Sequence, residues 1–321
     1  MTPDALAALA KAAARDLGFA ACGVTDLSAS AAAPALDRWL SASRQGEMRY
    51  MERQAPLRRE PARAWPAARS AIVVLDNYWQ TDAEPAPGRG RLARYALGDD
   101  YHDVLKVKLE RLGALLVGAA GSGSFRSYVD AGPLPERELA RRAGLGWIGK
   151  NTMLIHPRLG SFTFIGVLLT DLLVARDQPF EADRCGTCRR CLDACPTDAF
   201  PDPRVLDATR CISYFTIEAR GPVPEPLKAG VGDWLFGCDA CQDVCPWNVR
   251  FAQETAEPHF RARPPAEWPT LQEIVAMSER EFDDAFGATA LARAGRAGLA
   301  RNAAVVLGNT RGRSAAECPA A

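Results

Sequence analysis

The spacing of apolar residues predicts alternating helices and strands over the first half of the chain. Leucine and valine side chains repeat at helical spacing over 101–117, which predicts an amphipathic helix. Thr2 and Pro3 are typical of a helix start, and a helix is predicted from there over 5–17. Further helices are predicted over 35–43 and 134–143, and strands over 19–24, 70–75, 125–129 and 161–172.

The pattern changes between residues 180 and 248, where cysteines and prolines separate short helical segments. This texture indicates a module organised by metal ions. Helical periodicity then returns over 271–276, 278–286 and 299–307. The stretch between Asp284 and Glu317 contains no acidic residue, so the sequence predicts a basic helical tail. Its arginines are Arg293, Arg296, Arg301, Arg311 and Arg313.

Composition indicates a folded protein of more than one domain. The chain has 321 residues, of which 48% are hydrophobic and 24% are charged. Lys plus Arg and Asp plus Glu each total 39, so the formal net charge is zero. This balance excludes a strongly basic body that coats nucleic acid, and a polyanionic partner would need a local basic patch.

The sequence shows no targeting segment and no run of about 18 uncharged apolar residues that could span a membrane. We therefore expect a cytoplasmic protein without membrane association. In that reducing compartment, the ten cysteines are expected to be metal ligands or catalysts and not disulfides.

The first cysteine run has the spacing of bacterial ferredoxins. Cys185, Cys188, Cys191 and Cys195 form a C-x2-C-x2-C-x3-C-P motif. In such a motif the first three thiolates bind one 4Fe–4S cluster, and the fourth binds a second cluster.

A second run, from Cys238 to Pro246, lacks the first cysteine of that motif, and Cys211 is the nearby cysteine that can replace it. Paired C-x2-C units also form zinc sites, but the longer first run favours iron–sulfur clusters. Two adjacent clusters carry single electrons, so we expect a redox centre beside them. Counting gives two sites, one of Cys185, Cys188, Cys191 and Cys245 and one of Cys195, Cys211, Cys238 and Cys241, with Cys22 and Cys318 left over.

No convincing nicotinamide, flavin or cobalt-ligand motif is present. The G-x-G-x-x-G match at 144–149 follows a predicted helix, whereas the dinucleotide fingerprint follows a strand. We expect its glycines to allow close approach of a neighbouring strand or a bulky cofactor. Asp100 and His102 begin a D-x-H-x-x-G cobalamin motif, but Leu105 stands at the position of its glycine.

Several sequence blocks together resemble the epoxyqueuosine reductase family. The resemblance runs from about residue 5 to 310, and the family's cluster ligands fall on the eight cysteines already counted. The blocks are D-A-G-P at 130–133, E-R at 136–137, A-G-L-G-W-I-G-K-N at 143–151, C-I-S-Y-F-T-I-E at 211–218, G-C-D-A-C at 237–241, C-P-W-N at 245–248 and R-N-A-A-V at 301–305.

The resemblance implies two 4Fe–4S clusters and cobalamin, without a protein ligand below the cobalt. It implies reduction of epoxyqueuosine to queuosine at the wobble position of tRNA. The implied fold is α+β, with a cobalamin-binding α/β domain related to that of reductive dehalogenases over 1–177. A ferredoxin-like two-cluster domain is expected over 178–250, and HEAT-like helices that bind tRNA over 251–321.

Epoxide reduction to an alkene and water takes two electrons and two protons. The opening alkoxide needs a proton, which a carboxylic acid can supply if burial raises its pKa. In the family this donor corresponds to Asp130, which follows the predicted strand 125–129. The alternative is that Asp130 only caps the turn at Gly132 and Pro133.

The resemblance also implies residues around the corrin and residues that contact tRNA, each of which could instead be a packing or solvated residue. Ser213 and the loop from Cys238 to Cys241 are expected between the second cluster and the corrin. The tail arginines are expected to contact phosphates without reading sequence. The corrin residues are Arg53, Tyr101, His102, Asp130, Lys150, Asn151, Ser213, Asp239 and Ala240, and the tRNA residues are Arg293, Arg296 and Arg301.

Two other functions fit part of the sequence. A reductive dehalogenase shares these cofactors, but such enzymes usually begin with a twin-arginine export signal, which is not seen here. A two-cluster electron carrier would not need the long segment that precedes the clusters. For the reductase we expect a monomer that receives electrons from a donor of the flavodoxin or ferredoxin type.

Overall fold

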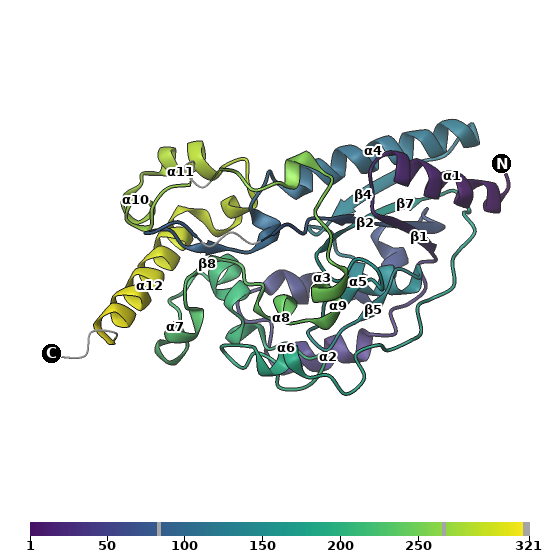
Figure 1. The fold of residues 1–321 in the computed structure, drawn as a ribbon. Coiled ribbons are helices and arrows are strands. Elements are labelled where there is room, and N and C mark those ends of the chain that lie inside the picture. Colours follow the sequence, from purple (N-terminus) through teal and green to yellow (C-terminus); the bar gives the residue numbers. More distant parts are fainter. Residues whose placement is uncertain (82–84, 265–267, 317–321) are drawn as a thin grey trace.

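The computed structural model describes residues 1–81, 85–264 and 268–316, with side chains up to residue 310. A four-stranded antiparallel sheet lies at its centre (Figure 1). The strand order is β1 (Ala21–Thr25), β2 (Ser70–Asn77), β7 (Thr163–Thr170) and β4 (Phe125–Val129). The long strands β2 and β7 pair along their whole length, from Ser70 opposite Thr170 to Asn77 opposite Thr163.

Both faces of this sheet are covered by helices. Helices α1 (Pro3–Asp16) and α4 (Tyr101–Ala120) pack on one face, and α5 (Glu136–Arg142) packs on the other. Alternate residues of β2 therefore enter two different apolar clusters, Ile72 on the α4 side and Val73 on the α5 side. This explains why the strand is apolar at successive positions.

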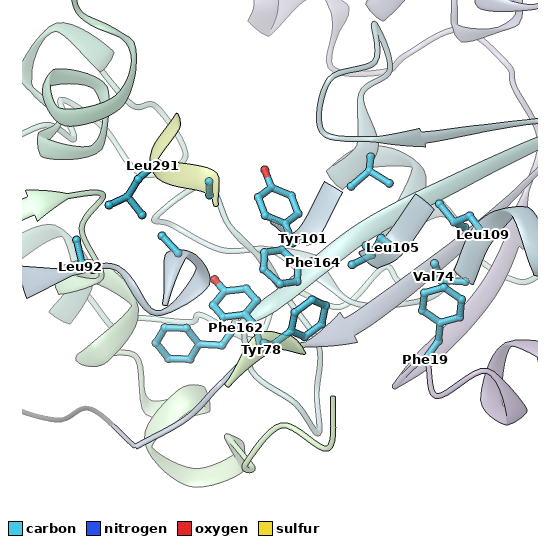
Figure 2. Close-up of a cluster of buried hydrophobic side chains, with 14 of the residues drawn as sticks. Phe19, Val74, Tyr78, Leu92, Tyr101, Leu105, Leu109, Phe162, Phe164 and Leu291 are labelled. Atoms are coloured by element: carbon cyan, nitrogen blue, oxygen red, sulfur yellow. The ribbon is translucent and has the colours of Figure 1, made fainter. Parts of the chain in front are cut away.

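Capping places the first turn of α4 at the end of the sheet. The Asp100 side chain accepts a hydrogen bond from the His102 backbone N–H at 3.0 Å and starts the helix, and Gly121 ends it with a φ of 81°. Tyr101 and His102 are consequently fixed in the first turn. Figure 2 shows Tyr101 beside Phe164, and the two rings stack at 4.3 Å with 4° between their planes.

The cysteine-rich segment has little regular structure. A short parallel pair between β3 and β8 joins it to the first part of the chain, and β5 pairs with β6 nearby. Its elements, with their partners, are β3 (Arg91–Leu92), η2 (Arg94–Ala96), β5 (Trp147–Ile148), β6 (Leu154–Ile155), α6 (Arg190–Asp193), η3 (Ala208–Arg210), η4 (Tyr214–Glu218), α7 (Glu225–Val231), β8 (Trp234–Phe236), α8 (Ala240–Asp243) and α9 (Pro246–Phe251).

The C-terminal helices share the apolar core of the sheet. Leu291 and Phe260 belong to the same buried cluster as Leu92, Leu105 and Phe164, part of which Figure 2 shows. Thr270 and Ser278 each form a capping box that starts a helix. The elements are η5 (Pro258–Phe260), α10 (Leu271–Ala276), α11 (Glu279–Phe286), η7 (Ala290–Ala294) and α12 (Gly295–Ala316).

Most predicted helices and strands are confirmed to within a few residues, although the last helix is much longer than the predicted 299–307, and the fold mixes α and β structure as expected. Two other helices differ from the sequence analysis. α2 (Ala33–Ser41) begins and ends two residues earlier, and α3 (Arg49–Arg59) was not predicted because its polar sequence shows no apolar period. The three domain ranges and the HEAT-like nature of the last helices stay predictions.

The glycine-rich segment 144–149 brings two stretches of backbone together. Gly146 has a φ of 151°, and a Cβ there would lie 2.2 Å from the carbonyl oxygen of Ile155 in β6. The expected close approach to a neighbouring strand is confirmed. None of the helices in the described part of the chain is long and apolar enough to cross a bilayer.

A buried ion cluster joins α4 to the sheet and to the segment before η5. Lys108 Nζ lies 2.5 Å from Asp76 Oδ2 and 3.3 Å from Glu257 Oε2, and 4.6 Å from the ring centre of Phe19. Burial raises the pKa of Asp76 to about 6, against the charge of Lys108. Removing the lysine would therefore leave two carboxylates together in a buried site.

We expect Lys108→Met to lower the free energy of unfolding by about 3 kcal/mol, because it breaks a buried charge cluster. Urea unfolding followed by tryptophan fluorescence measures this change. Lys106→Met is the matched control, since Lys106 is exposed on the same helix. Equal stability of the two variants would show that the cluster adds nothing.

Candidate active site and cluster ligands

The first group of cysteines joins the two runs. Burial, followed by the charges of Cys245, Cys185 and Cys188, raises the pKa of Cys191, so these four sulfurs are near neighbours. Cys185 and Cys245 also pack in one apolar cluster. The fourth member therefore comes from the far end of the second run.

The second group combines Cys195 of the first run with Cys211, Cys238 and Cys241. Burial raises the pKa of Cys238, and the charges of Cys211 and Cys195 act in the same direction. Burial and then the charges of Cys238 and Cys211 also raise the pKa of Cys241. The charge of Cys191 reaches Cys241 as well, so the two groups are adjacent.

The surroundings of these sulfurs suit thiolate ligands of iron. The Ala199 N–H donates to Cys195 Sγ at 3.3 Å, and Trp147 Nε1–H donates to Cys185 Sγ at 3.4 Å. Such donors stabilise deprotonated sulfur and tune iron–sulfur clusters. Backbone N–H groups also donate to Cys211, Cys238 and Cys245.

Among the described residues, no three His, Cys, Asp or Glu side chains converge on a point that could hold a single metal ion. In a 4Fe–4S cube each thiolate binds a different iron at its own corner, so its ligands need not converge. The two groups of four are therefore compatible with cluster ligation.

Asp130 lies directly after β4, in a left-handed conformation with a φ of 53°. Tyr101 Oη donates a hydrogen bond to Asp130 Oδ2 at 2.6 Å, and His102 Nε2 lies 3.8 Å from the same oxygen. Burial lowers the pKa of His102, but the hydrogen bond and charge of Asp100, with a contribution from the charge of Asp130, raise it above its ordinary value. The Asp130 side chain is 67% exposed, so the protein alone does not provide the burial that a proton-donating carboxyl requires.

A chain of contacts connects the second cysteine group to Asp130. Asp239 follows Cys238. Its Oδ2 accepts a hydrogen bond from the backbone N–H of Arg94 at 2.8 Å and another from Arg94 Nη1 at 3.2 Å. Tyr95, the next residue, packs edge-on against Tyr101 with ring centres 5.9 Å apart. Tyr101 then contacts Asp130. The second group is thus the one that faces the carboxylate.

Tyr50 and an ion pair lie on the other side of Asp130. Arg293 Nη2 is 3.0 Å from Glu218 Oε2, and its guanidinium lies 5.9 Å from the ring centre of Tyr50. Burial raises the pKa of Tyr50, and the charges of Glu218, Arg293 and Asp130 all reach it. Tyr50 and this ion pair are therefore close enough to Asp130 for their charges to interact.

Glu136 is a residue that the sequence analysis noted without assigning a role. It begins α5, and its carboxylate accepts a hydrogen bond from the Asp130 backbone N–H. Burial, with the charge of Asp130, raises the pKa of Glu136 to about 8, although Arg58 and Arg137 oppose the shift. Its Oε1 is buried without a hydrogen-bond partner among the described residues. The sequence signal was an acid after the proline-containing turn that follows Asp130.

Arg58 holds the turn between Asp130 and Glu136. Its Nη1 donates to the Leu134 carbonyl at 2.8 Å, and its Nη2 donates to the Gly132 carbonyl at 3.2 Å. Gly132 and Leu134 of this turn are therefore tied to α3, whereas Asp130 has no contact with Arg58 of this kind.

The other residues expected near the corrin occupy different surroundings. Arg53 is exposed on α3. Lys150 Nζ donates to the carbonyls of Gly186 at 2.7 Å and Cys188 at 2.8 Å, so it holds the loop of the first group.

Asn151, Ser213, Asp239 and Ala240 lie at the second group. Asn151 is buried and Nδ2 donates to the Cys241 carbonyl at 3.4 Å. Ser213 donates to Cys211 through both its backbone and its side chain. Asp239 is buried and paired with Arg94. The structure therefore gathers Tyr101 and His102 at Asp130 and places these residues nearer the cysteines.

The tail arginines have partners from other parts of the chain. Arg293 pairs with Glu218, and Arg296 Nε lies 2.7 Å from Glu279 Oε1. Arg301 is half-buried and donates to backbone carbonyls of residues 215, 219 and 221. The stretch itself has no acids, but the fold supplies them. Cys22 is a half-buried thiol in the α1–β1 packing, and Cys318 lies outside the described residues.

Comparison with known proteins matches two family models to this chain. One is described as "4Fe-4S double cluster binding domain" and covers residues 184–248, the segment that contains all eight cysteines. The other is described as "Epoxyqueuosine reductase QueG, DUF1730" and covers residues 58–131.

Curated relatives and solved structures match most of the chain. The epoxyqueuosine reductase of Escherichia coli K12 is 42% identical over 299 residues, which is 92% of this chain and 78% of that protein. That of Cellulophaga algicola is 40% identical over 92% of this chain and 95% of the relative. An epoxyqueuosine reductase crystallised with an epoxyqueuosine-modified tRNA-Tyr stem loop is 32% identical with a TM-score of 0.84, over 96% of this chain and 82% of that one.

The Bacillus subtilis epoxyqueuosine reductase, solved with its catalytic aspartate loop swung out of the active site, is 31% identical with a TM-score of 0.82 over 96% of this chain and 82% of that one. Sequence identity above 30% over nearly the full length, a shared fold and the double-cluster segment all agree. The chain belongs to the epoxyqueuosine reductase family.

Proposed function

We propose that this protein reduces epoxyqueuosine to queuosine at the wobble position of tRNA. The observation that carries the proposal is its 42% identity to an epoxyqueuosine reductase over 92% of the chain. The eight cysteines in two groups and the carboxylate beside the second group are the parts that this reaction requires. The solved relative with an epoxyqueuosine-modified tRNA stem loop supports tRNA as the substrate carrier.

Two 4Fe–4S clusters would be held by the two groups of cysteines, each with one ligand from the other run. Cobalamin would lie between the second group and Asp130, near Tyr101, His102, Ser213 and Ala240, with Arg53 at its edge. Cobalamin bound there would supply a strongly reducing cobalt centre. The buried Asp239–Arg94 pair would hold the loop of the second group rigid beside it.

Asp130 would give the proton that the opening epoxide oxygen requires. Tyr101 donates to Oδ2, so the transferable proton resides on Oδ1 of the neutral acid. Substrate and cofactor would cover this exposed carboxyl and exclude water from it. Tyr101, stacked on Phe164, would orient the carboxyl toward the substrate.

The Asp130 turn would exchange between an inward and an outward position. Its positive φ is a strained conformation for a residue with a side chain, and Arg58 anchors only the far end of the turn. The relative from Bacillus subtilis whose catalytic aspartate loop is swung out supports such an exchange. Glu136 would stabilise the inward position, because it accepts the Asp130 N–H.

Arg293 and Arg296 would contact tRNA phosphates, and Arg293 would do so at the rim of the active site. Arg301 would act indirectly, since its hydrogen bonds shape the backbone around η4. We place this activity in the cytoplasm, where a monomer would take electrons from a flavodoxin or ferredoxin type of donor.

Asp130→Asn should keep both clusters and cobalamin but lower turnover by at least about 100-fold, because an amide cannot donate the required proton. Liquid chromatography of nucleosides from tRNA treated with the reduced enzyme measures turnover. Asp16→Asn, an exposed residue on α1, is the control. Full activity in the Asp130 variant would remove the proton-donor role.

Glu136→Gln should remove a pH dependence of stability. The folded Glu136 has a pKa of about 8 against an ordinary value of 4.5, so between these values the folded state holds a proton that the unfolded state loses. Stability from this residue therefore falls as pH rises through that window, and the variant should show a flatter profile. Thermal unfolding midpoints between pH 5 and pH 9 test this, with exposed Glu181→Gln as control.

Combined Arg293→Ala and Arg296→Ala substitutions should weaken tRNA binding and reduce its salt slope by about one per lost phosphate contact. Filter binding at several salt concentrations measures both. Arg15→Ala is the control, since Arg15 is exposed on α1. An unchanged slope would assign these arginines to their ion pairs alone.

A further inference from the structure

The two cysteine groups differ in their access to solvent. Residues around the first group, such as Gly186, Thr187 and Arg189, are exposed. Gly237 and Asp239 on either side of Cys238 are buried, and that group faces the active site. Electrons from outside the protein would therefore enter at the first group.

Aromatic rings lead from the first group to the surface at α9. Trp147 donates to Cys185 Sγ, and its ring meets that of Trp247 edge-on at 4.8 Å. Trp247 stacks on Phe251 at 5.5 Å, and Val249 between them on α9 is 73% exposed. A protein that covers α9 would thus be separated from Cys185 by the rings of Trp247 and Trp147.

Two arginines rim these rings. The Arg184 guanidinium lies 5.3 Å from the ring centre of Phe180 and 5.9 Å from that of Trp247. The Arg250 guanidinium lies 5.1 Å from the ring centre of Phe251. Both arginines are exposed, and within the described residues neither forms an ion pair.

The two acids that precede Arg184 are paired with arginines, whereas Glu254, beyond Phe251, is exposed and forms no ion pair with a described residue. Asp183 pairs with Arg204 at 2.6 Å, and Glu181 lies 3.7 Å from Arg141. The patch is therefore positive as well as apolar. In Figure 1, α9 lies near the middle of the molecule and α12 lies at its left-hand end.

We propose that this α9 surface, formed by Arg184, Trp247, Val249, Arg250 and Phe251, docks the acidic face of a small electron-carrier protein. Aromatic residues and arginine are the side chains enriched in protein interfaces, and positive charge steers an acidic partner. The inference rests on the proposed function for its clusters. Each encounter oxidises the carrier by one electron and reduces the first cluster by one. Two encounters supply one epoxide reduction.

The test measures binding of a purified acidic flavodoxin to the anaerobic holoenzyme by calorimetry, without tRNA, at low and high salt. Val249→Glu places a negative charge on the surface and should raise Kd at least tenfold. Val107→Glu is the matched control, because Val107 is an exposed valine (54%) on α4. Combined Arg184→Glu and Arg250→Glu should raise Kd similarly and flatten its salt dependence, whereas Arg111→Glu on α4 should not.

Iron content and visible absorbance show whether each variant keeps its clusters. Unchanged flavodoxin affinity in variants that keep them would overturn the proposal. Weakened tRNA binding with unchanged flavodoxin binding would also overturn it and make the surface a nucleic-acid contact. Failure of the wild-type enzyme to reduce epoxyqueuosine with a chemical reductant would instead contradict the proposed function, and the binding measurement would still stand.

Discussion

The fold of the cysteine-rich segment depends on an exchange of ligands between its two runs. Cys245 lies with Cys185, Cys188 and Cys191, and Cys195 lies with the other group, so neither group is complete unless the runs cross. The segment has short helices and few apolar residues, which would not stabilise its fold by themselves. Cluster formation would therefore supply much of its folding free energy, as metal binding does in other small domains.

The proposed active site would combine a rigid side with a movable one. Tyr101 and His102 belong to the capped first turn of α4 and rest on the aromatic core, whereas Asp130 lies at the strained end of a turn that Arg58 ties at the other end. This division allows the carboxyl to leave while the group that orients it stays in place. Glu136 would be sensitive to this movement, because its carboxylate accepts a hydrogen bond from the backbone of Asp130 itself.

Local patterns predicted much of this structure, and long-range partners account for what they missed. Apolar periodicity predicted the sheet strands and α4, and cysteine spacing predicted the two groups. The polar helix α3 has no apolar period, so the sequence did not predict it. The sequence also made the C-terminal arginines look unpaired, because Glu218 and Glu279 approach only in the folded chain. The buried carboxyl of Glu136 depends on Arg58 and on a turn, and no single-residue signal reports that.

Because Tyr101 stacks flat on Phe164, packing of the hydrophobic core determines where the Tyr101 hydroxyl lies. Phe164 also packs against Tyr78 and Phe260, so the hydroxyl that meets Asp130 is held by rings from three separate stretches of chain. Drift in core volume over evolution would displace that hydroxyl as surely as a change in the pocket. Interior and reaction centre are thus constrained to vary together.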